Sequence, residues 1–176
     1  MIAIQDGHGG YSNPLDEQTG VVQLINFLET QPDWKSTAVI ITYDDSDGWY
    51  DHAYVTPTHG SFDSVADQVN GAGTCGTAGT QPNGISGQPV NGRCGPGVRI
   101  PFIVVSPWAK KNYIASTSIS QASIVQFVED NWLHSERLGG GSFDATAGSI
   151  MPMFNFHGTG NTPTLTLDPS TGEPTS

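Results

Sequence analysis

Apolar residues at helical spacing mark the first regular element that the sequence predicts. Val21, Leu24, Ile25 and Leu28 fall on one face of a helix, which is the pattern of an amphipathic helix. Pro14 lies shortly before them, and proline is favoured at the first helical position because its missing N–H needs no partner there. The pattern therefore predicts a helix from residue 13 to about residue 30.

Two short apolar runs predict strands, and a second amphipathic stretch predicts another helix. Residues 37–43 are a short β-branched run without polar alternation, and residues 99–106 are a second apolar run that ends at Pro107, which predicts two buried strands. Ser106-Pro107 is interpreted as a strand terminator and not as a nucleophile, because it does not match the G-x-S-x-G elbow. A helix is expected from Ser118 or Ser120 to about His134, with these residues facing inward: Ile124, Val125, Phe127 and Val128. The order helix, strand, loop, strand, helix fits the α/β class, as part of a layered sheet.

Four aspartates follow the first predicted strand within eight positions: Asp44, Asp45, Asp47 and Asp51. Carboxylates this crowded repel one another unless a positive charge lies among them. In an open α/β sheet, ligands gather at the carboxyl ends of the strands, where Asp44 and Asp45 fall. The sequence therefore favours a divalent cation at Asp44 and Asp45 over the alternative of a solvated acidic turn. The spacing does not match an EF-hand calcium loop, although a calcium-stabilised binding module stays open.

The composition is that of one soluble domain covering residues 1–176. The formal charge is −11, from 17 acids and 6 bases, which argues against nucleic acid or an anionic membrane as a non-specific partner. No apolar run reaches the 18 or more residues that a transmembrane helix needs. The first residues show neither the basic nor the apolar region of a signal peptide.

Two segments lack a clear periodicity. Residues 53–97 form a long loop rich in Gly, Asn, Thr, Ser and Pro, and residues 139–176 form a loop-rich tail. Cys75 and Cys94 both lie in the long loop, and a disulfide between them would stabilise the fold by roughly 3 kcal/mol. A disulfide implies a secreted or periplasmic protein; two free thiols in a cytosolic chain are the alternative.

Several long motifs occur in the order typical of one family. They are DGHGGYSNPLDEQTG at 6–20, TYDDSDGWYDH at 42–52, GRCGPGVRIPFIVVSPWAKKNYI at 92–114, SIVQFVEDNW at 123–132 and LDPSTGEP at 167–174. Together they resemble the bacterial phosphoesterase family of acid phosphatases and phospholipases C, within the alkaline phosphatase superfamily. The YDD form and the cysteine pair resemble the acid-phosphatase branch more closely.

The resemblance implies metal-dependent hydrolysis of a phosphate ester. It places the metal, of unassigned identity, on Asp44 and Asp45, and places His8 beside the scissile phosphate. It also implies an alkaline-phosphatase-like layered α/β sheet with the Gly-rich loop as an excursion. The family's nucleophile belongs to an N-terminal half that has no counterpart here, so the chain is expected to be the C-terminal part of a catalytic domain, completed by a missing half or a partner chain. A truncated, non-catalytic remnant is the alternative.

Overall fold

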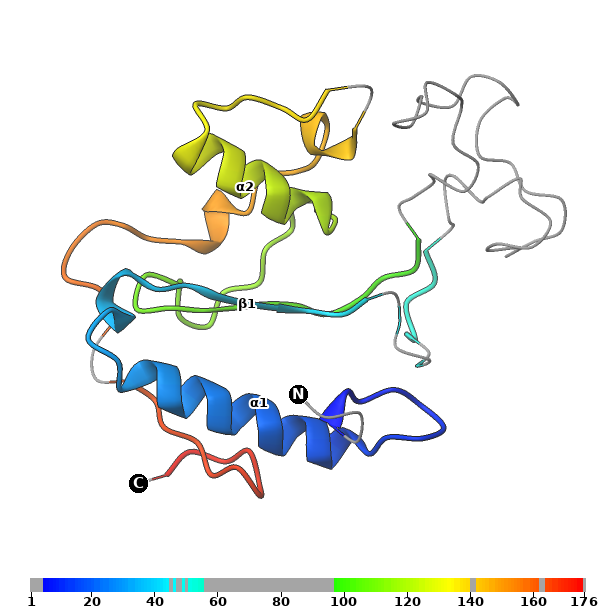
Figure 1. Cartoon of the computed structure of the whole chain (residues 1–176), viewed down its shortest axis with the longest axis vertical. Coiled ribbons are helices and arrows are strands. Elements are labelled where there is room, and N and C mark those ends of the chain that lie inside the picture. The colour runs from blue at the N-terminus through cyan, green and yellow to red at the C-terminus, as the bar shows by residue number, and fades with distance from the viewer. Residues whose placement is uncertain are drawn as a thin grey trace, which may run out of the picture. The chain divides into compact units, whose positions relative to one another are not determined.

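The computed structural model describes residues 5–44, 46, 49, 51–55, 97–139, 142–161 and 164–175. These residues fall into two compact units. The first consists of residues 1–51, 100–114 and 153–176, and the second of residues 52–99 and 115–152. The described elements are mixed helix and strand, as an α/β chain requires (Figure 1).

Helix α1 (Pro14–Glu29) opens the first unit and confirms the predicted helix. The Asn13 side chain accepts a hydrogen bond from the Leu15 amide at 2.9 Å, which satisfies one of the amides that a helix start leaves unpaired. Val22 is the buried residue of this helix. A 3-10 turn, η2 (Trp34–Ser36), follows and buries Trp34.

Strands β1 (Val39–Thr42) and β2 (Phe102–Val105) form an antiparallel pair. Val39 pairs with Val105 and Thr42 pairs with Phe102, so the carboxyl end of β1 lies beside the start of β2. The expectation that both strands are buried on both faces is wrong for the described structure: every residue of β1 is half-buried, and Ile103 of β2 is 50% exposed. In the part of the chain that is described, each strand has only the other as a ladder partner.

The end of β2 is fixed by a side chain. The Ser106 hydroxyl donates to the Thr37 carbonyl at 2.8 Å and accepts from the Trp108 amide at 3.2 Å. Ser106 is buried and precedes Pro107, so it ends the strand and holds the next segment beside the start of β1. This agrees with reading Ser106-Pro107 as a strand terminator rather than as a nucleophile.

The C-terminal segment, residues 164–175, returns to α1 (red beside blue in Figure 1). Asn26 bonds both backbone groups of Leu167: its Nδ2 donates to the carbonyl at 2.7 Å, and its Oδ1 accepts from the amide at 3.2 Å. The Thr19 hydroxyl also donates to the Pro169 carbonyl at 3.0 Å. These contacts attach the C-terminal segment to two positions along α1.

The second unit is built around helix α2 (Ala122–Trp132). The expectation that Val125 and Val128 face inward is wrong, because they are 40% and 42% exposed. The buried residues of α2 are Ser123 and Glu129. Both are polar, and both have partners that make burial tolerable: the Ser123 hydroxyl accepts from the Ser120 amide, and the Glu129 carboxylate pairs with Arg137 at 3.2 Å.

Short turns complete the second unit. The turn η3 (Phe143–Ala145) buries Asp144, and η4 (Met151–Met153) begins next to the buried Ile150. The side chain of Gln126 donates to the carbonyls of Asp144 and Ala147, which joins α2 to the η3 region. None of the described helices is long and apolar enough to cross a membrane.

Candidate functional site

The loop that carries His8 is closed by its own polar groups. Asp6 Oδ1 accepts from the His8 amide at 3.1 Å, and the Tyr11 hydroxyl donates to Asp6 Oδ2 at 3.1 Å. Across the loop, the Gly7 amide donates to the Ser12 hydroxyl at 3.0 Å. Asp6 therefore holds both ends of the loop around His8, a role that the sequence analysis did not assign.

Hydrogen bonds stabilise the ionised form of the Asp6 carboxyl group. The hydrogen bond from the His8 amide, the largest cause, together with the hydroxyls of Tyr11 and Ser12, holds the pKa of Asp6 below its ordinary value of 3.8, although desolvation by burial acts in the opposite direction. A carboxylate that accepts several hydrogen bonds is stabilised in its ionised form. Asp6 is consequently ionised wherever this loop is intact near neutral pH.

The His8 ring has a fixed orientation. Its Nδ1 lies 2.7 Å from the Gly9 carbonyl oxygen, and its ring stacks on Tyr11 with centroids 4.7 Å apart and planes 14° from parallel. Because a carbonyl can only accept a hydrogen bond, Nδ1 carries the proton. Nε2 is then the ring nitrogen that can face a ligand, as an acceptor in the neutral ring or a donor in the charged one.

The structure places Asp44 two residues beyond the carboxyl end of β1, with an exposed side chain. Asp45 lies outside the described residues, so the expected pair cannot be compared in geometry. Within the described ranges, no group of three or more His, Cys, Asp or Glu side chains is arranged to hold a metal ion. Carboxylate oxygens suit hard divalent cations such as Mg²⁺, Ca²⁺ or Mn²⁺. The exposed Asp44 carboxylate is therefore a chemically suitable ligand for such a cation.

One hydrogen bond joins the His8 loop to the loop that follows β1. The Trp49 indole Nε1 donates to the Gly7 carbonyl at 2.6 Å. Gly7 is buried, whereas Trp49 is 49% exposed. Since Trp49 lies five residues after Asp44, this contact brings the two segments that carry the predicted site residues together. The sequence analysis did not find this link, because 42 residues separate the partners.

The other expected features lie elsewhere. Cys75 and Cys94 are outside the described residues, so their disulfide stays a prediction, as does the excursion of the Gly-rich loop. Trp108 donates its indole N–H to the Lys35 carbonyl at 2.8 Å and lies against Phe156. Both contacts are structural.

Comparison with known proteins assigns these motifs to a family. Residues 2–133 match the model of the Phosphoesterase family. The chain is 37% identical over 110 residues to a non-hemolytic phospholipase C of Burkholderia pseudomallei, and this alignment covers 62% of the chain and 15% of that protein. It is 32% identical over 143 residues to a hemolytic phospholipase C of Pseudomonas aeruginosa, and this alignment covers 81% of the chain and 18% of that protein. The chain thus spans less than a fifth of the length of either relative.

Proposed function

Because this chain belongs to the Phosphoesterase family, we propose that it supplies the His8 loop and the carboxyl end of β1 to a site that hydrolyses phosphoric esters. The observation that carries the proposal is the hydrogen bond of 2.6 Å from Trp49 Nε1 to the Gly7 carbonyl. It joins the only two segments to which the family motif assigns site residues in this chain. The names of both relatives, phospholipases C, support a phosphoric ester as the substrate class.

We assign Asp44 and Asp45 to a divalent cation. Such a cation, when bound, polarises phosphoryl oxygens and offsets the negative charge that develops on them. The role of the two aspartates is to hold it at the carboxyl end of β1, where an open sheet commonly binds ligands. The exposure of Asp44 supports this role, because its oxygens are not taken up by packing.

The role assigned to His8 is to bind the leaving oxygen or a phosphoryl oxygen of the ester. With Nδ1–H bonded to the Gly9 carbonyl, Nε2 is directed to the ligand, and in the charged ring it donates a hydrogen bond or a proton. A positioned general acid contributes typically 10²- to 10⁴-fold, about 3–5 kcal/mol, to such a reaction. The stacking of Tyr11 on the ring and the anchoring of the loop by Asp6 keep His8 in this orientation.

The remaining parts of the expected enzyme are proposals as well. The attacking group is assigned to a part of the protein that corresponds to the unmatched length of the relatives, or to a partner chain. The two strands then form part of an alkaline-phosphatase-like layered sheet, and Cys75 and Cys94 form a disulfide in a secreted or periplasmic protein. Both a phosphate monoester and a phospholipid are retained as substrates, and the assay includes one of each.

The test follows cation binding and turnover separately. The chain is treated with a chelator, thermal unfolding is followed while Mg²⁺, Ca²⁺ or Mn²⁺ is added, and p-nitrophenyl phosphate and phosphatidylcholine are then offered as substrates. We expect a cation-dependent rise in the unfolding temperature that is lost in Asp44→Asn. The matched control is Asp33→Asn, whose exposed side chain makes no capping hydrogen bond, and which should keep the whole rise.

The two readouts separate the possible failures. Cation stabilisation requires no attacking group, so it is expected from this chain alone. Turnover, whether by the chain alone or together with the part proposed to carry the attacking group, should require the cation and fall at least about 100-fold in His8→Asn. A rise of the same size in Asp44→Asn and wild type, or turnover that resists both the chelator and His8→Asn, would refute the proposal.

A further inference from the structure

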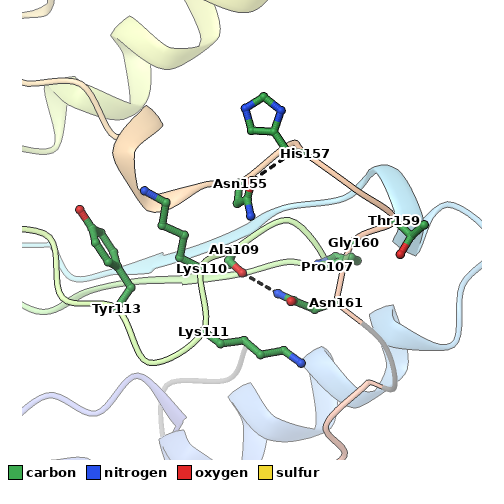
Figure 2. A pocket seen from close by; sticks show the side chains of 10 residues that line it. All are labelled: Pro107, Ala109, Lys110, Lys111, Tyr113, Asn155, His157, Thr159, Gly160 and Asn161. Carbon is green, nitrogen blue, oxygen red and sulfur yellow. Dashed lines mark hydrogen bonds between the residues drawn. The ribbon is translucent and has the colours of Figure 1, made fainter.

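A pocket with a mixed polar and apolar lining lies at the opposite end of the β1–β2 pair from Asp44. Its volume is about 400 Å³, and its walls come from residues 107–113 and 155–161 (Figure 2). Pro107 follows β2, whose last residue, Val105, pairs with Val39 at the start of β1. Asp44 lies beyond the other end of β1, roughly 20 Å away at the rise of an extended chain. The pocket is therefore separate from the proposed phosphoesterase site.

The walls of the pocket are held together by backbone hydrogen bonds. The Lys110 amide donates to the Met153 carbonyl at 2.9 Å, and the Asn155 amide donates to the Trp108 carbonyl at 2.8 Å. Asn161 adds two more bonds to the same segment: its amide donates to the Pro107 carbonyl at 2.6 Å, and its side-chain Nδ2 donates to the Ala109 carbonyl at 2.5 Å. The two walls are thus fixed to each other without a ligand, which lowers the cost of binding one.

The backbone of the second wall packs against the first at Gly160. Gly160 has a φ of +78°, and a Cβ at this position would lie 3.4 Å from both the Cβ and the carbonyl oxygen of Pro107. Glycine adopts this left-handed conformation without the steric cost that other residues pay. The close approach of Gly160 allows the hydrogen bond from the next amide, of Asn161, to the Pro107 carbonyl.

The charge of the lining is opposite to that of the whole chain. The full sequence has 17 acids and 6 bases, yet the lining contains Lys110, Lys111 and His157 and no acid. Within the described part of the chain, neither lysine forms an ion pair with a carboxylate. The Lys110 ammonium lies 4.6 Å from the centroid of the Tyr113 ring, a contact that places the cation while leaving its three N–H donors available.

Asn155 supplies a further donor at the pocket. Asn155 uses its Oδ1 to accept the His157 amide at 3.1 Å, which turns the donor end of its side-chain amide toward the wall formed by residues 107–111 (Figure 2). Figure 2 also shows Lys110 and Tyr113 at one end of the pocket and Lys111 leaving the chain in a different direction. Lysine, amide and phenol donors are the groups that hydrogen-bond phosphate oxygens.

We propose that this pocket binds a phosphate group of an anionic ligand, with Lys110, Lys111 and Asn155 as its donors. The phosphate belongs either to a small soluble molecule or to the head group of an anionic lipid. The lining residue Tyr113 is 44% exposed, and Ile114 and Phe156, which follow the lining residues Tyr113 and Asn155 along the chain, are 92% and 52% exposed. The proposal does not depend on the hydrolytic activity proposed above, because it involves neither Asp44 nor His8.

The experiment measures phosphate binding with all divalent cations removed. Inorganic phosphate is titrated into the ¹⁵N-labelled chain in the presence of a chelator, and backbone amide signals are followed by NMR. We expect saturable shifts centred on residues 109–111 and 155–161, with a dissociation constant in the millimolar range, on the order expected for a few charge-assisted hydrogen bonds at an open site. Raising the ionic strength from about 0.02 M to about 0.3 M should weaken binding, because salt screens exposed charges.

Matched lysine variants distinguish a built pocket from general attraction of anions. Lys111→Gln and Lys110→Gln should each weaken phosphate binding about tenfold, as expected for the loss of one charge-assisted hydrogen bond. Lys35→Gln removes the same charge outside the lining and should change binding less than about twofold. Equal losses in all three variants, or shifts that do not saturate, would overturn the proposal.

Two further measurements complete the test. Asp44→Asn should bind phosphate as wild type does, so failure of the proposed hydrolytic site would leave this result unchanged. Co-sedimentation with vesicles of phosphatidylglycerol, compared with vesicles of phosphatidylcholine, identifies the source of the phosphate. Lysine-dependent binding to the anionic vesicles supports a lipid head group, and phosphate binding without vesicle binding supports a soluble ligand. If the chain binds neither inorganic phosphate nor anionic vesicles, the proposal is overturned.

Discussion

The hydrogen bond between Trp49 and Gly7 can be removed with little change in shape. Trp49→Phe keeps an aromatic ring but deletes the indole N–H that donates to the Gly7 carbonyl at 2.6 Å. A hydrogen bond contributes a net 0.5–1.5 kcal/mol, and a buried acceptor left unsatisfied costs about 1–3 kcal/mol. Because Trp49 is half-exposed, water can partly replace the lost donor. We therefore expect the lower end of this range, about 1 kcal/mol.

Two measurements follow this loss. For a chain of this size, about 1 kcal/mol corresponds to a fall of roughly 2–4 °C in the unfolding temperature. If the loop of residues 5–12 opens independently of the rest, its hydrogen exchange should become about fivefold faster, the factor that corresponds to 1 kcal/mol. Exchange in a peptide covering these residues, measured by mass spectrometry, reports on the loop directly.

Two other tryptophans provide the controls. Trp132→Phe should change neither measurement, since Trp132 is 67% exposed and its indole N–H has no hydrogen-bond partner among the described residues. Trp108→Phe removes a comparable bond to the Lys35 carbonyl, so it should lower the unfolding temperature without speeding exchange in residues 5–12. Unchanged exchange in Trp49→Phe would refute the inference that this indole joins the His8 loop to the loop after β1.

Three further predictions concern positions outside this contact. Asp6 has a lowered pKa, so its stabilisation of the loop is complete above pH 3.8 and is lost as the pH falls through the lower pKa of the folded state. The exchange protection of residues 5–12, taken relative to the intrinsic exchange rate at each pH, should therefore fall in that range in wild type and not in Asp6→Asn. Asn26→Ala removes both bonds to Leu167 and should cost about 1–2 kcal/mol in urea unfolding, together with faster proteolysis of the C-terminal segment; intact protease resistance would contradict this. Gly148→Ala places a Cβ against the Ser118 carbonyl oxygen, closer than atoms can approach, so the backbone must shift and the free energy of unfolding should fall by about 1–3 kcal/mol. Gly97, which has open space around its Cβ position and no positive φ, should accept alanine without this loss.

Local sequence signals predicted the elements whose causes are local. The predicted helix start at Asn13-Pro14 follows from a proline and apolar spacing within one short segment, and α1 begins at Pro14 with Asn13 as its cap. The end of β2 was likewise predicted from Pro107, which cannot donate to a strand ladder. In both cases the decisive residues are neighbours along the chain.

Burial was harder to predict because it depends on partners distant in sequence. Glu129 is only 3% exposed on a helix whose valines were expected inside, and its burial is made possible by Arg137, eight residues further along the chain. Hydropathy assigns glutamate to the surface unless such a partner is known. The same reasoning applies to β1, whose partial exposure depends on which segments pack against it.

The sequence motif named candidate site residues, His8 and the aspartates after β1, and their roles stay predictions. The structure adds contacts around them: Asp6 and Tyr11 hold His8, and Trp49 bonds the neighbouring Gly7 carbonyl. A tyrosine three residues after a histidine carries no specific signal, and an indole N–H can reach many carbonyls. Such contacts follow from the folded path of the chain rather than from any pattern in the sequence.

The attachment of the C-terminal segment to α1 has a practical consequence for how the protein can be handled. Asn26 bonds Leu167, and Thr19 bonds Pro169. Removing residues 164–175 to aid crystallisation would therefore delete these hydrogen bonds to α1. Affinity tags or fluorescent reporters are better fused beyond Thr175, where they leave these attachments undisturbed.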